Sequence, residues 1–250
     1  MSILRLVMKT HQLRRVTLVS AVALFLTAEP AAADFIAVPN AFANAPGDDR
    51  LSTLFRSLDR TFQTVIGASQ LTAIQPGSLI TGFSFRLDEG ETAFPTVPLT
   101  FPQYNIQLST SLNAAGALSN TFANNIGPGV VLVRSGPLTL PPNSYVPGPG
   151  VDPFGFVVPF TTPYTYLGDN LLITVRLQGN GVDDRFFDAN TNIAGVIQTI
   201  GATSFTGTVN DNITGFFSPI YELQFSQVPE PSTLTLLSLG AVLLGYARRR

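Results

Sequence analysis

Residues 79–87 read LITGFSFRL, and their second half alternates strictly, with Phe83, Phe85 and Leu87 on one face of an extended chain. A period of two is typical of a β-strand that buries one of its faces. Residues 104–109, YNIQLS, repeat this period. The two stretches predict strands that pack their apolar faces onto a common core.

Further β-branched and aromatic runs follow along the chain, separated by turn-forming segments such as GPG at 127–129 and PGPG at 147–150. Many short strands with Gly/Pro turns are typical of antiparallel sandwiches and jelly rolls. We therefore expect a mainly β fold, an antiparallel, jelly-roll-like β-sandwich in one domain. The further expected strands are residues 130–133, 155–160, 171–177, 204–209 and 220–225.

Two segments depart from the β pattern. The apolar residues of 51–58 are spaced at i, i+3, i+4 and i+7, and Asp48 or Asp49 is available as a helix cap. Ser119 is a candidate cap for a second short helix that runs through Phe122. The sequence thus predicts one or two short helices, with an irregular loop as the alternative at each place.

The ionisable residues exclude several classes of function. The chain has no cysteine, and its single lysine and single histidine, Lys9 and His11, both lie near the N-terminus. Ser–His–Asp, Cys–His and Ser–Lys machinery is therefore unavailable to the rest of the chain. Residues 34–227 carry seven arginines and fourteen acidic residues, a net charge of −7. Such a segment repels nucleic acid, so we expect no nucleic-acid partner.

The N-terminus has the pattern of an export signal. Four basic residues precede an apolar run at 16–28, and Ala31 and Ala33 occupy the −3 and −1 positions before Asp34. A run of this length is shorter than the roughly twenty residues of a membrane-spanning helix. We expect residues 1–33 to form a signal helix that signal peptidase removes, and an exported body that begins at Asp34.

The C-terminus combines three elements in a fixed order. Val228-Pro229-Glu230-Pro231 precedes an uncharged, Leu-rich run at 232–247, and Arg248, Arg249 and Arg250 follow. Prolines on both sides of a glutamate keep this segment extended and accessible. The apolar run predicts a transmembrane helix of about 24 Å, and the terminal arginines predict that its end stays in the cytoplasm.

This arrangement resembles the PEP-CTERM sorting signal of Gram-negative bacteria. The resemblance implies that an exosortase in the membrane recognises and cleaves the tail near Val228–Pro231. It also divides the chain into a signal peptide at 1–33, a body at 34–227 and a sorting signal at 228–250. A permanent membrane anchor behind a proline-rich stalk is the alternative, since anchoring retains the tail that processing removes.

Parts of the body also resemble a group of PEP-CTERM proteins for which no activity is established. The segments that carry this resemblance are FSFR at 83–86, IQLST at 106–110, LSNTFANNIG at 118–127 and the stretch 159–173. In the last of these, Gly168-Asp169-Asn170 departs from the group by an inserted aspartate. The resemblance implies a shared domain and location, and it assigns no catalytic residue.

Carboxylates are the remaining chemical groups of the body, in two clusters at 88–91 and 183–188. Paired carboxylates across a cleft hydrolyse glycosides, which makes a carbohydrate-active hydrolase the alternative function. Oxygen ligands at alternating positions also suit Ca²⁺, although the segment from Asp188 lacks the glycine and glutamate of an EF-hand. The weak calcium candidates are Asp183, Asp184, Asp188 and Asn190, with solvated turns as the alternative.

Aromatic residues near the proline-rich loop suggest a surface for sugars. Phe154, Phe156, Tyr164 and Tyr166 are candidates for stacking against saccharide rings, with burial in the core as the alternative. We expect a non-enzymatic protein without a resident cofactor, exported to the cell surface or the extracellular matrix. Exopolysaccharide is the expected partner there, besides the two processing enzymes.

Overall fold

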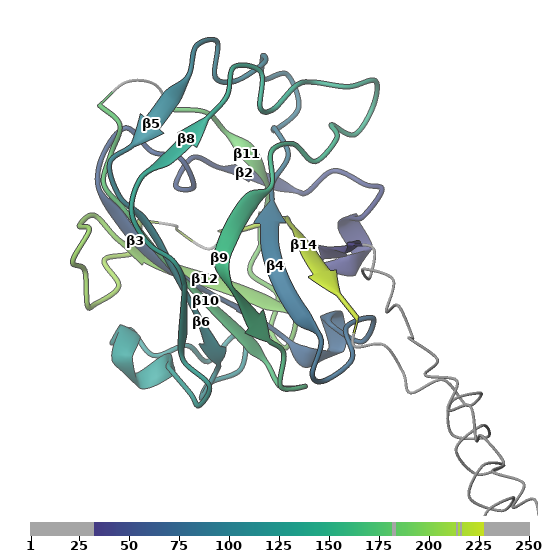
Figure 1. The fold of residues 1–250 in the computed structure, drawn as a ribbon, viewed down its shortest axis with the longest axis vertical. Coiled ribbons are helices and arrows are strands. Elements are labelled where there is room, and N and C mark those ends of the chain that lie inside the picture. The colour runs from purple at the N-terminus through teal and green to yellow at the C-terminus, as the bar shows by residue number, and fades with distance from the viewer. Residues whose placement is uncertain (1–32, 182–183, 214, 216, 228–250) are drawn as a thin grey trace, which may run out of the picture. The chain divides into compact units, whose positions relative to one another are not determined.

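Antiparallel β-strands dominate the computed structural model, which describes residues 33–181, 184–213, 215 and 217–227 (Figure 1). Each ladder pairs its strands antiparallel, so the predicted mainly β, antiparallel architecture is confirmed. The expected signal helix and the expected transmembrane helix at 232–247 lie outside the described residues. Within those residues, no helix is long and apolar enough to cross a membrane.

The first large sheet has four strands in the order β1-β14-β4-β9. The alternating stretch that opens at Leu79 forms its β4, and Phe83 faces Leu223 of β14 across the ladder. A register shift interrupts the pairing of β4 with β9 between Ile80 and Gly82. The strands are β1 Asp34–Val38, β14 Tyr221–Ser226, β4 Leu79–Ser84 and β9 Val158–Thr165.

The second large sheet has five strands in the order β12-β3-β10-β6-β7. Its β3 is buried along its whole length, so both faces of this strand are covered. This strand was not predicted, because its seven residues include four polar ones, Arg60, Thr61, Gln63 and Thr64, so its complete burial is not visible in the sequence. The strands are β12 Ile197–Ala202, β3 Arg60–Ile66, β10 Leu171–Leu177, β6 Tyr104–Thr110 and β7 Val131–Arg134.

Two small sheets complete the described strands. One has the order β13-β11-β2, and the other pairs β5 with β8. Within the first, β11 places Phe187 opposite Leu51 of β2. The strands are β13 Phe217–Pro219, β11 Phe187–Thr191, β2 Asp49–Leu51, β5 Leu99–Phe101 and β8 Leu138–Leu140.

One hydrophobic cluster joins the inner faces of the two large sheets. Phe55 lies within an aromatic group in this cluster and has no exposed surface. Its ring centroid is 5.3 Å from that of Phe187, 5.6 Å from those of Tyr104 and Tyr145, and 5.8 Å from that of Phe85. Phenylalanine and tyrosine thus fill a core that contains no tryptophan.

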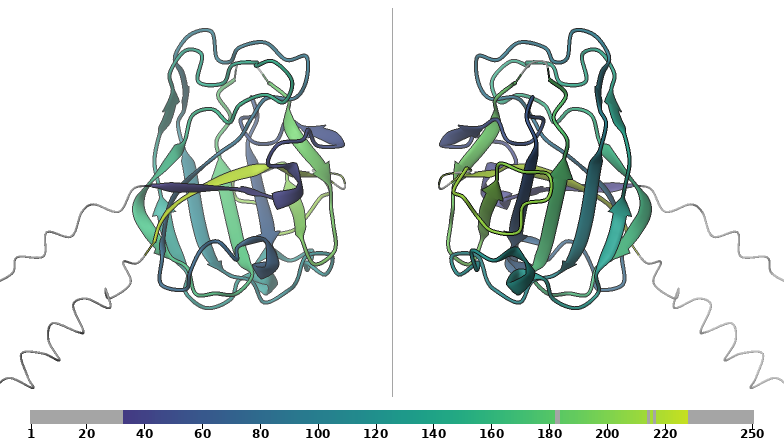
Figure 2. Two further views of the ribbon diagram at one scale, coloured as in Figure 1. Left: turned by 90° about the vertical axis from the view of Figure 1, so that its right-hand side faces the viewer. Right: turned by 90° about the vertical axis from the view of Figure 1, so that its left-hand side faces the viewer.

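Loops cover parts of the outer face of the five-stranded sheet. Residues 111–126 include the 3₁₀ helix η3 (Phe122–Asn125), and Asn125 Nδ2 donates to Gln63 Oε1 of β3 over 3.0 Å. The segment after β12 crosses the same face and accepts a hydrogen bond of 2.7 Å from the Thr61 hydroxyl at the Ser204 carbonyl. Figure 2 shows this yellow-green segment against the sheet. The two loops leave part of the face open between them.

The helix predicted at 51–58 is wrong, because β2 ends at Leu51 and a turn-rich loop follows. Leu54 and Phe55 are fully buried from this loop, whereas 59% of Leu58 is exposed. Their helical spacing therefore reflects the burial of a loop. The described residues contain three short 3₁₀ helices, namely η1 (Asn40–Phe42), η2 (Ala68–Gln70) and η3.

The structure also corrects the predicted cap of the second helix and the strand predicted at 204–209. Ser119 does not cap η3, which begins at Phe122; its hydroxyl accepts from the Thr121 amide over 3.2 Å and so stabilises the preceding turn. The strand predicted at 204–209 is wrong, because this segment forms a turn in which Gly207 N donates to Ser204 O over 3.1 Å. Only Val209 makes an isolated bridge there, to Thr121.

Candidate functional site

The fold brings the two acidic clusters of the sequence together. Leu87 forms a bridge to Phe187, and Asp88 N donates to the Phe186 carbonyl over 3.2 Å. On the flank of this contact, Arg185 lies 3.8 Å from a Glu91 carboxylate oxygen. Segments about one hundred residues apart in sequence therefore form one acidic region.

A pocket of about 250 Å³ opens in this region. Two of its carboxylates, Asp152 and Asp188, come from different elements, the proline-rich loop and β11. Glu89, from the first acidic cluster, also lines it. The full lining is Pro46, Leu87, Glu89, Gly150, Val151, Asp152 and Asp188.

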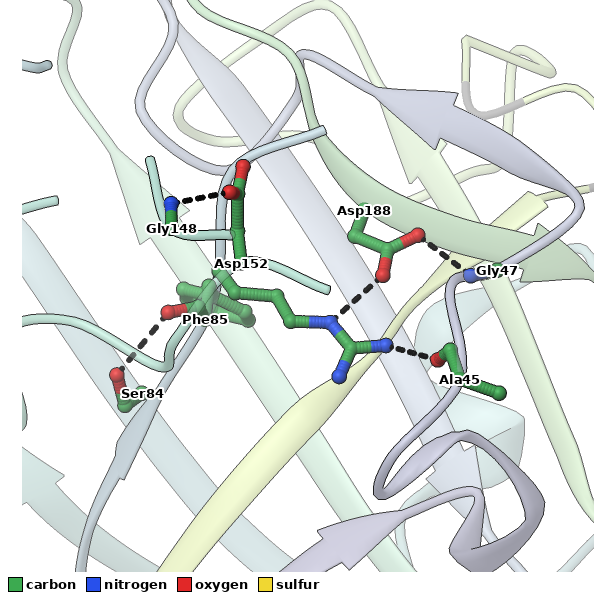
Figure 3. A network of polar contacts seen from close by, with 8 residues as sticks. Ala45, Gly47, Ser84, Phe85, Gly148, Asp152 and Asp188 are labelled. Atoms are coloured by element: carbon green, nitrogen blue, oxygen red, sulfur yellow. Dashed lines mark hydrogen bonds and ion pairs between the residues drawn. The ribbon is translucent and has the colours of Figure 1, made fainter. Parts of the chain in front are cut away.

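A buried ion pair forms the base of the site (Figure 3). Arg86 Nε lies 2.6 Å from Asp188 Oδ2, and the two side chains are 1% and 6% exposed. The other oxygen, Asp188 Oδ1, accepts from the backbone amide of Gly47 over 2.8 Å. A terminal nitrogen of Arg86 donates to the Ala45 carbonyl. Both oxygens of Asp188 are therefore engaged, and the pair ties β11 and Arg86, which lies two residues past the end of β4, to segment 45–47.

Two further groups complete the surroundings of Arg86. The Phe154 ring centroid lies 5.1 Å from the guanidinium carbon, a cation–π contact. Asp152 Oδ1 accepts from the Gly148 amide over 2.7 Å, which closes a turn of the proline-rich loop. Asp152 Oδ2 is buried without a hydrogen-bond partner among the described residues. Figure 3 shows Asp152 directed toward Gly148.

Burial dominates the electrostatics of the site. It raises the pKa of Asp188, although the hydrogen bond and charge of Arg86 act in the opposite direction. Burial also raises the pKa of Asp88, and the negative charge of Asp188 adds to that shift. An acid–base catalyst needs a carboxyl group that can exchange its proton with a substrate, whereas Asp188 is held in an ion pair. The arrangement is that of a structural ion pair beside a small pocket.

The structure places the calcium candidates in separate contacts. Asp184 accepts from the Ser57 amide over 2.6 Å and pairs with Arg56 Nε over 3.1 Å. Asn190 Nδ2 donates to Thr191 O over 2.6 Å, and its Oδ1 is buried without a partner among the described residues. Asp183 lies outside those residues, which contain no group of three or more acidic or histidine side chains placed to hold a metal. The calcium site therefore stays a prediction.

The aromatic residues proposed for sugar stacking do not form an exposed platform. Tyr164 and Tyr166 are 1% and 3% exposed and belong to the main core. Phe156 is partly buried against that core, and Phe154 covers Arg86. Burial explains Tyr164 and Tyr166, whereas Phe154 and Phe156 are partly buried.

The two predicted processing sites flank neighbouring strands. Asp34 is the first residue of β1 and lies opposite Phe225 of β14. Gln227, the residue before the Val228–Pro231 motif, accepts from the Ser78 hydroxyl over 2.8 Å and donates to the Ala73 carbonyl over 2.7 Å. Ala33 is exposed. The remaining residues predicted for processing and membrane topology lie outside the described residues. They are Ala31, Val228, Pro229, Glu230, Pro231, Arg248, Arg249 and Arg250.

Comparison with known proteins assigns the tail. Residues 227–250 match the family model of the PEP-CTERM protein-sorting motif. The prediction of a PEP-CTERM motif is thereby confirmed, and the motif identifies a protein that is exported and sorted by an exosortase at its C-terminus. No curated protein and no solved structure matches the chain.

Sequence reasoning missed Arg86 as the partner of Asp188. The two residues are 102 positions apart, and no local spacing connects them. The local sequence provides no signal either, because Arg86 takes the polar position that the alternating stretch 79–87 already has between Phe85 and Leu87. A charge at such a position is expected to face solvent, so only the structure reveals that Arg86 is buried and paired.

Proposed function

We propose that the chain is a non-enzymatic exported protein whose body, residues 34–227, acts at the cell surface or in the extracellular matrix. The match of residues 227–250 to the PEP-CTERM sorting motif carries this proposal. Signal peptidase cleaves after Ala33, and an exosortase processes the tail near Val228–Pro231. The body then associates with exopolysaccharide.

The pairing of β1 with β14 supports processing at both places. Asp34, the first residue after the predicted signal cleavage, lies opposite Phe225. The side chain of Gln227 holds the other end against the loop at 73–78. Cleavage outside these two residues removes no described strand, and the shared core of the two large sheets supports a stable β-sandwich body.

The occupied carboxylates support a non-enzymatic role. Asp188 is bound at both oxygens, and Asp184 is bound by Arg56 and the Ser57 amide. Glu91 lies near Arg185. Residues 34–227 also contain no cysteine, histidine or lysine that would supply a nucleophile or a base near neutral pH.

Intact-mass spectrometry of the protein from the producing cells tests the proposal. We expect a form that begins at Asp34 and ends near Val228. A chain in which Pro229 and Pro231 are both replaced by alanine serves as the comparison, and it should keep its tail and remain with the membrane. A wild-type protein that retains Arg250 at the cell surface would overturn processing and favour permanent anchoring.

A further inference from the structure

An open groove lies on the outer face of the five-stranded sheet. Its volume is about 130 Å³, and its lining is Asn105, Gln107, Ile126, Leu132, Thr174 and Arg176. The register explains this set, because Gln107 of β6 lies opposite both Leu132 of β7 and Thr174 of β10. Two residues further along the same two strands, on the same face, Asn105 of β6 lies opposite Arg176 of β10.

Arg176 shares with Arg134 the lack of a carboxylate partner among the described residues, but Arg134 has both terminal nitrogens bound to carbonyls and its Nε buried. Three arginines of the described part of the chain form ion pairs with carboxylates, and Arg176 is not among them. Arg60 is buried but has three aspartates nearby that favour its charge. Burial lowers the pKa of Arg176, and no nearby charge opposes that shift. The guanidinium nevertheless stays protonated in proteins, so its charge has no counter-charge among the described residues.

One terminal nitrogen fixes the orientation of this guanidinium. Arg176 Nη1 donates to the Gly207 carbonyl over 2.8 Å, and to the Phe205 carbonyl and the Thr61 hydroxyl over 3.1 Å each. Nε and Nη2 donate to none of the described residues and remain accessible to solvent. These two nitrogens form the edge that binds a carboxylate through two parallel hydrogen bonds.

The neighbouring side chains suit a sugar that carries this carboxylate. The Gln107 amide makes no hydrogen bond with the described residues, so it can both donate to and accept from ring hydroxyls. Leu132 is 55% exposed at the rim of the groove and offers an apolar contact for the C–H groups of a ring. The small volume accommodates a carboxylate and part of one ring.

We propose that this groove binds the carboxylate of a uronic acid in an acidic exopolysaccharide. The inference rests on the proposed association of the body with exopolysaccharide and assigns that association a site and a ligand class. The body as a whole repels such a polymer, since its net charge is −7. A positioned guanidinium without a counter-charge provides the local attraction, and binding should weaken as salt screens the charge.

Affinity electrophoresis of the full chain in detergent tests the site, with polygalacturonate in the gel and neutral dextran as the reference polymer. We expect polygalacturonate to retard the wild-type chain and dextran to retard it much less. Arg176→Gln should weaken the retardation about tenfold or more, the effect of losing a charge-assisted hydrogen bond. Arg50→Gln removes the same charge from an exposed side chain outside the groove, and should leave retardation unchanged.

A second variant guards against a loss of binding that is caused by misfolding of Arg176→Gln. Gln107→Glu adds a negative charge beside Arg176 without removing an internal hydrogen bond, and should weaken the retardation at least as much as Arg176→Gln. Gln103→Glu adds that charge outside the groove lining and serves as its control. Loss of binding in Gln107→Glu and Arg176→Gln, with both controls intact, would support the site.

The remaining outcomes separate the two proposals. Equal retardation of the wild type and both groove variants would overturn the site while leaving the polysaccharide association in place. A chain that no polymer retards would overturn the association and the site together, without affecting the sorting experiment. In a competition experiment, polyglutamate and free polygalacturonate are each added to displace the chain from the polygalacturonate in the gel. If polyglutamate displaces it equally well, the groove binds carboxylates without recognising the sugar, and the saccharide assignment is overturned.

Discussion

Arg86 and Arg176 place the same guanidinium in two different electrostatic situations. Arg86 is buried against Asp188, and its charge ties β11 and segment 45–47 to the end of β4. Arg176 is half-buried against carbonyl and hydroxyl groups, and no described carboxylate faces it. The difference teaches that a paired arginine serves the fold, whereas an unpaired one has charge available for a ligand.

The largest expected effect is on the paired arginine. Asp188→Ala leaves Arg86 buried without its counter-charge and should lower the free energy of unfolding by about 3–5 kcal/mol. Urea denaturation of the full chain measures this loss. The double variant Arg86→Met/Asp188→Leu removes both charges and should recover most of the stability. A loss below about 1 kcal/mol in Asp188→Ala would show that the ion pair does not hold these segments together.

The backbone beside this ion pair gives a second test. A β-carbon on Gly47 would lie 1.8 Å from the Ala189 carbonyl oxygen and 2.6 Å from Asp188 Oδ1. Gly47→Ala should therefore push segment 45–47 away from β11 and cost about 1–3 kcal/mol, as overpacking does. Gly136→Ala is an instructive comparison, because a β-carbon there meets nothing within 4 Å and only the positive φ of 93° opposes it. A smaller loss in Gly47→Ala than in Gly136→Ala would contradict the close approach.

The unpaired arginine should matter less for stability. Arg176→Gln removes the donor that holds the turn at Phe205 and Gly207 and should cost about 1 kcal/mol in the same urea experiment. No buried counter-charge is left behind, which explains the difference from Asp188→Ala. A loss as large as that of Asp188→Ala would make Arg176 a second structural anchor and would remove the contrast.

An unpaired carboxylate provides the smallest effect. Burial raises the pKa of Glu222 above its ordinary value of 4.5. The folded chain then binds more protons than the unfolded chain just above that value, so stability should fall as the pH rises through this range. Glu222→Gln should flatten the fall. A wild-type stability that rises over the same range, with no change in the variant, would show that Glu222 is not penalised by burial.

Local sequence patterns predicted the strands whose residues are mainly apolar or alternate between apolar and polar. The alternation of 79–87 and 104–109 locates β4 and β6, and the run at 171–177 coincides with β10. The same reasoning missed β3, in which four of seven residues are polar although all seven are buried. It also assigned a helix to 51–58, where a loop supplies Phe55 to the core. Periodicity reports which residues are buried, and a buried loop can share the period of a helix.

The site was less predictable than the strands, because its contacts are not local. The sequence identified both acidic clusters, but nothing in it placed Arg86 between Asp188 and segment 45–47. The groove is equally hard to predict, because its side chains come together only through the register of β6 with β7 and β10. The sorting motif was predictable because its three elements are contiguous in the chain. Their order can be recognised in the sequence without knowledge of the fold.

The thermal unfolding midpoint of the full chain with and without polygalacturonate tests most directly whether Arg176 carries a ligand site. A ligand that binds only the folded state raises the midpoint. We predict a rise for the wild type and for Arg50→Gln, no rise for Arg176→Gln or Gln107→Glu, and none with dextran. An equal rise in the wild type and in both groove variants would contradict the account, because the ligand would then bind elsewhere.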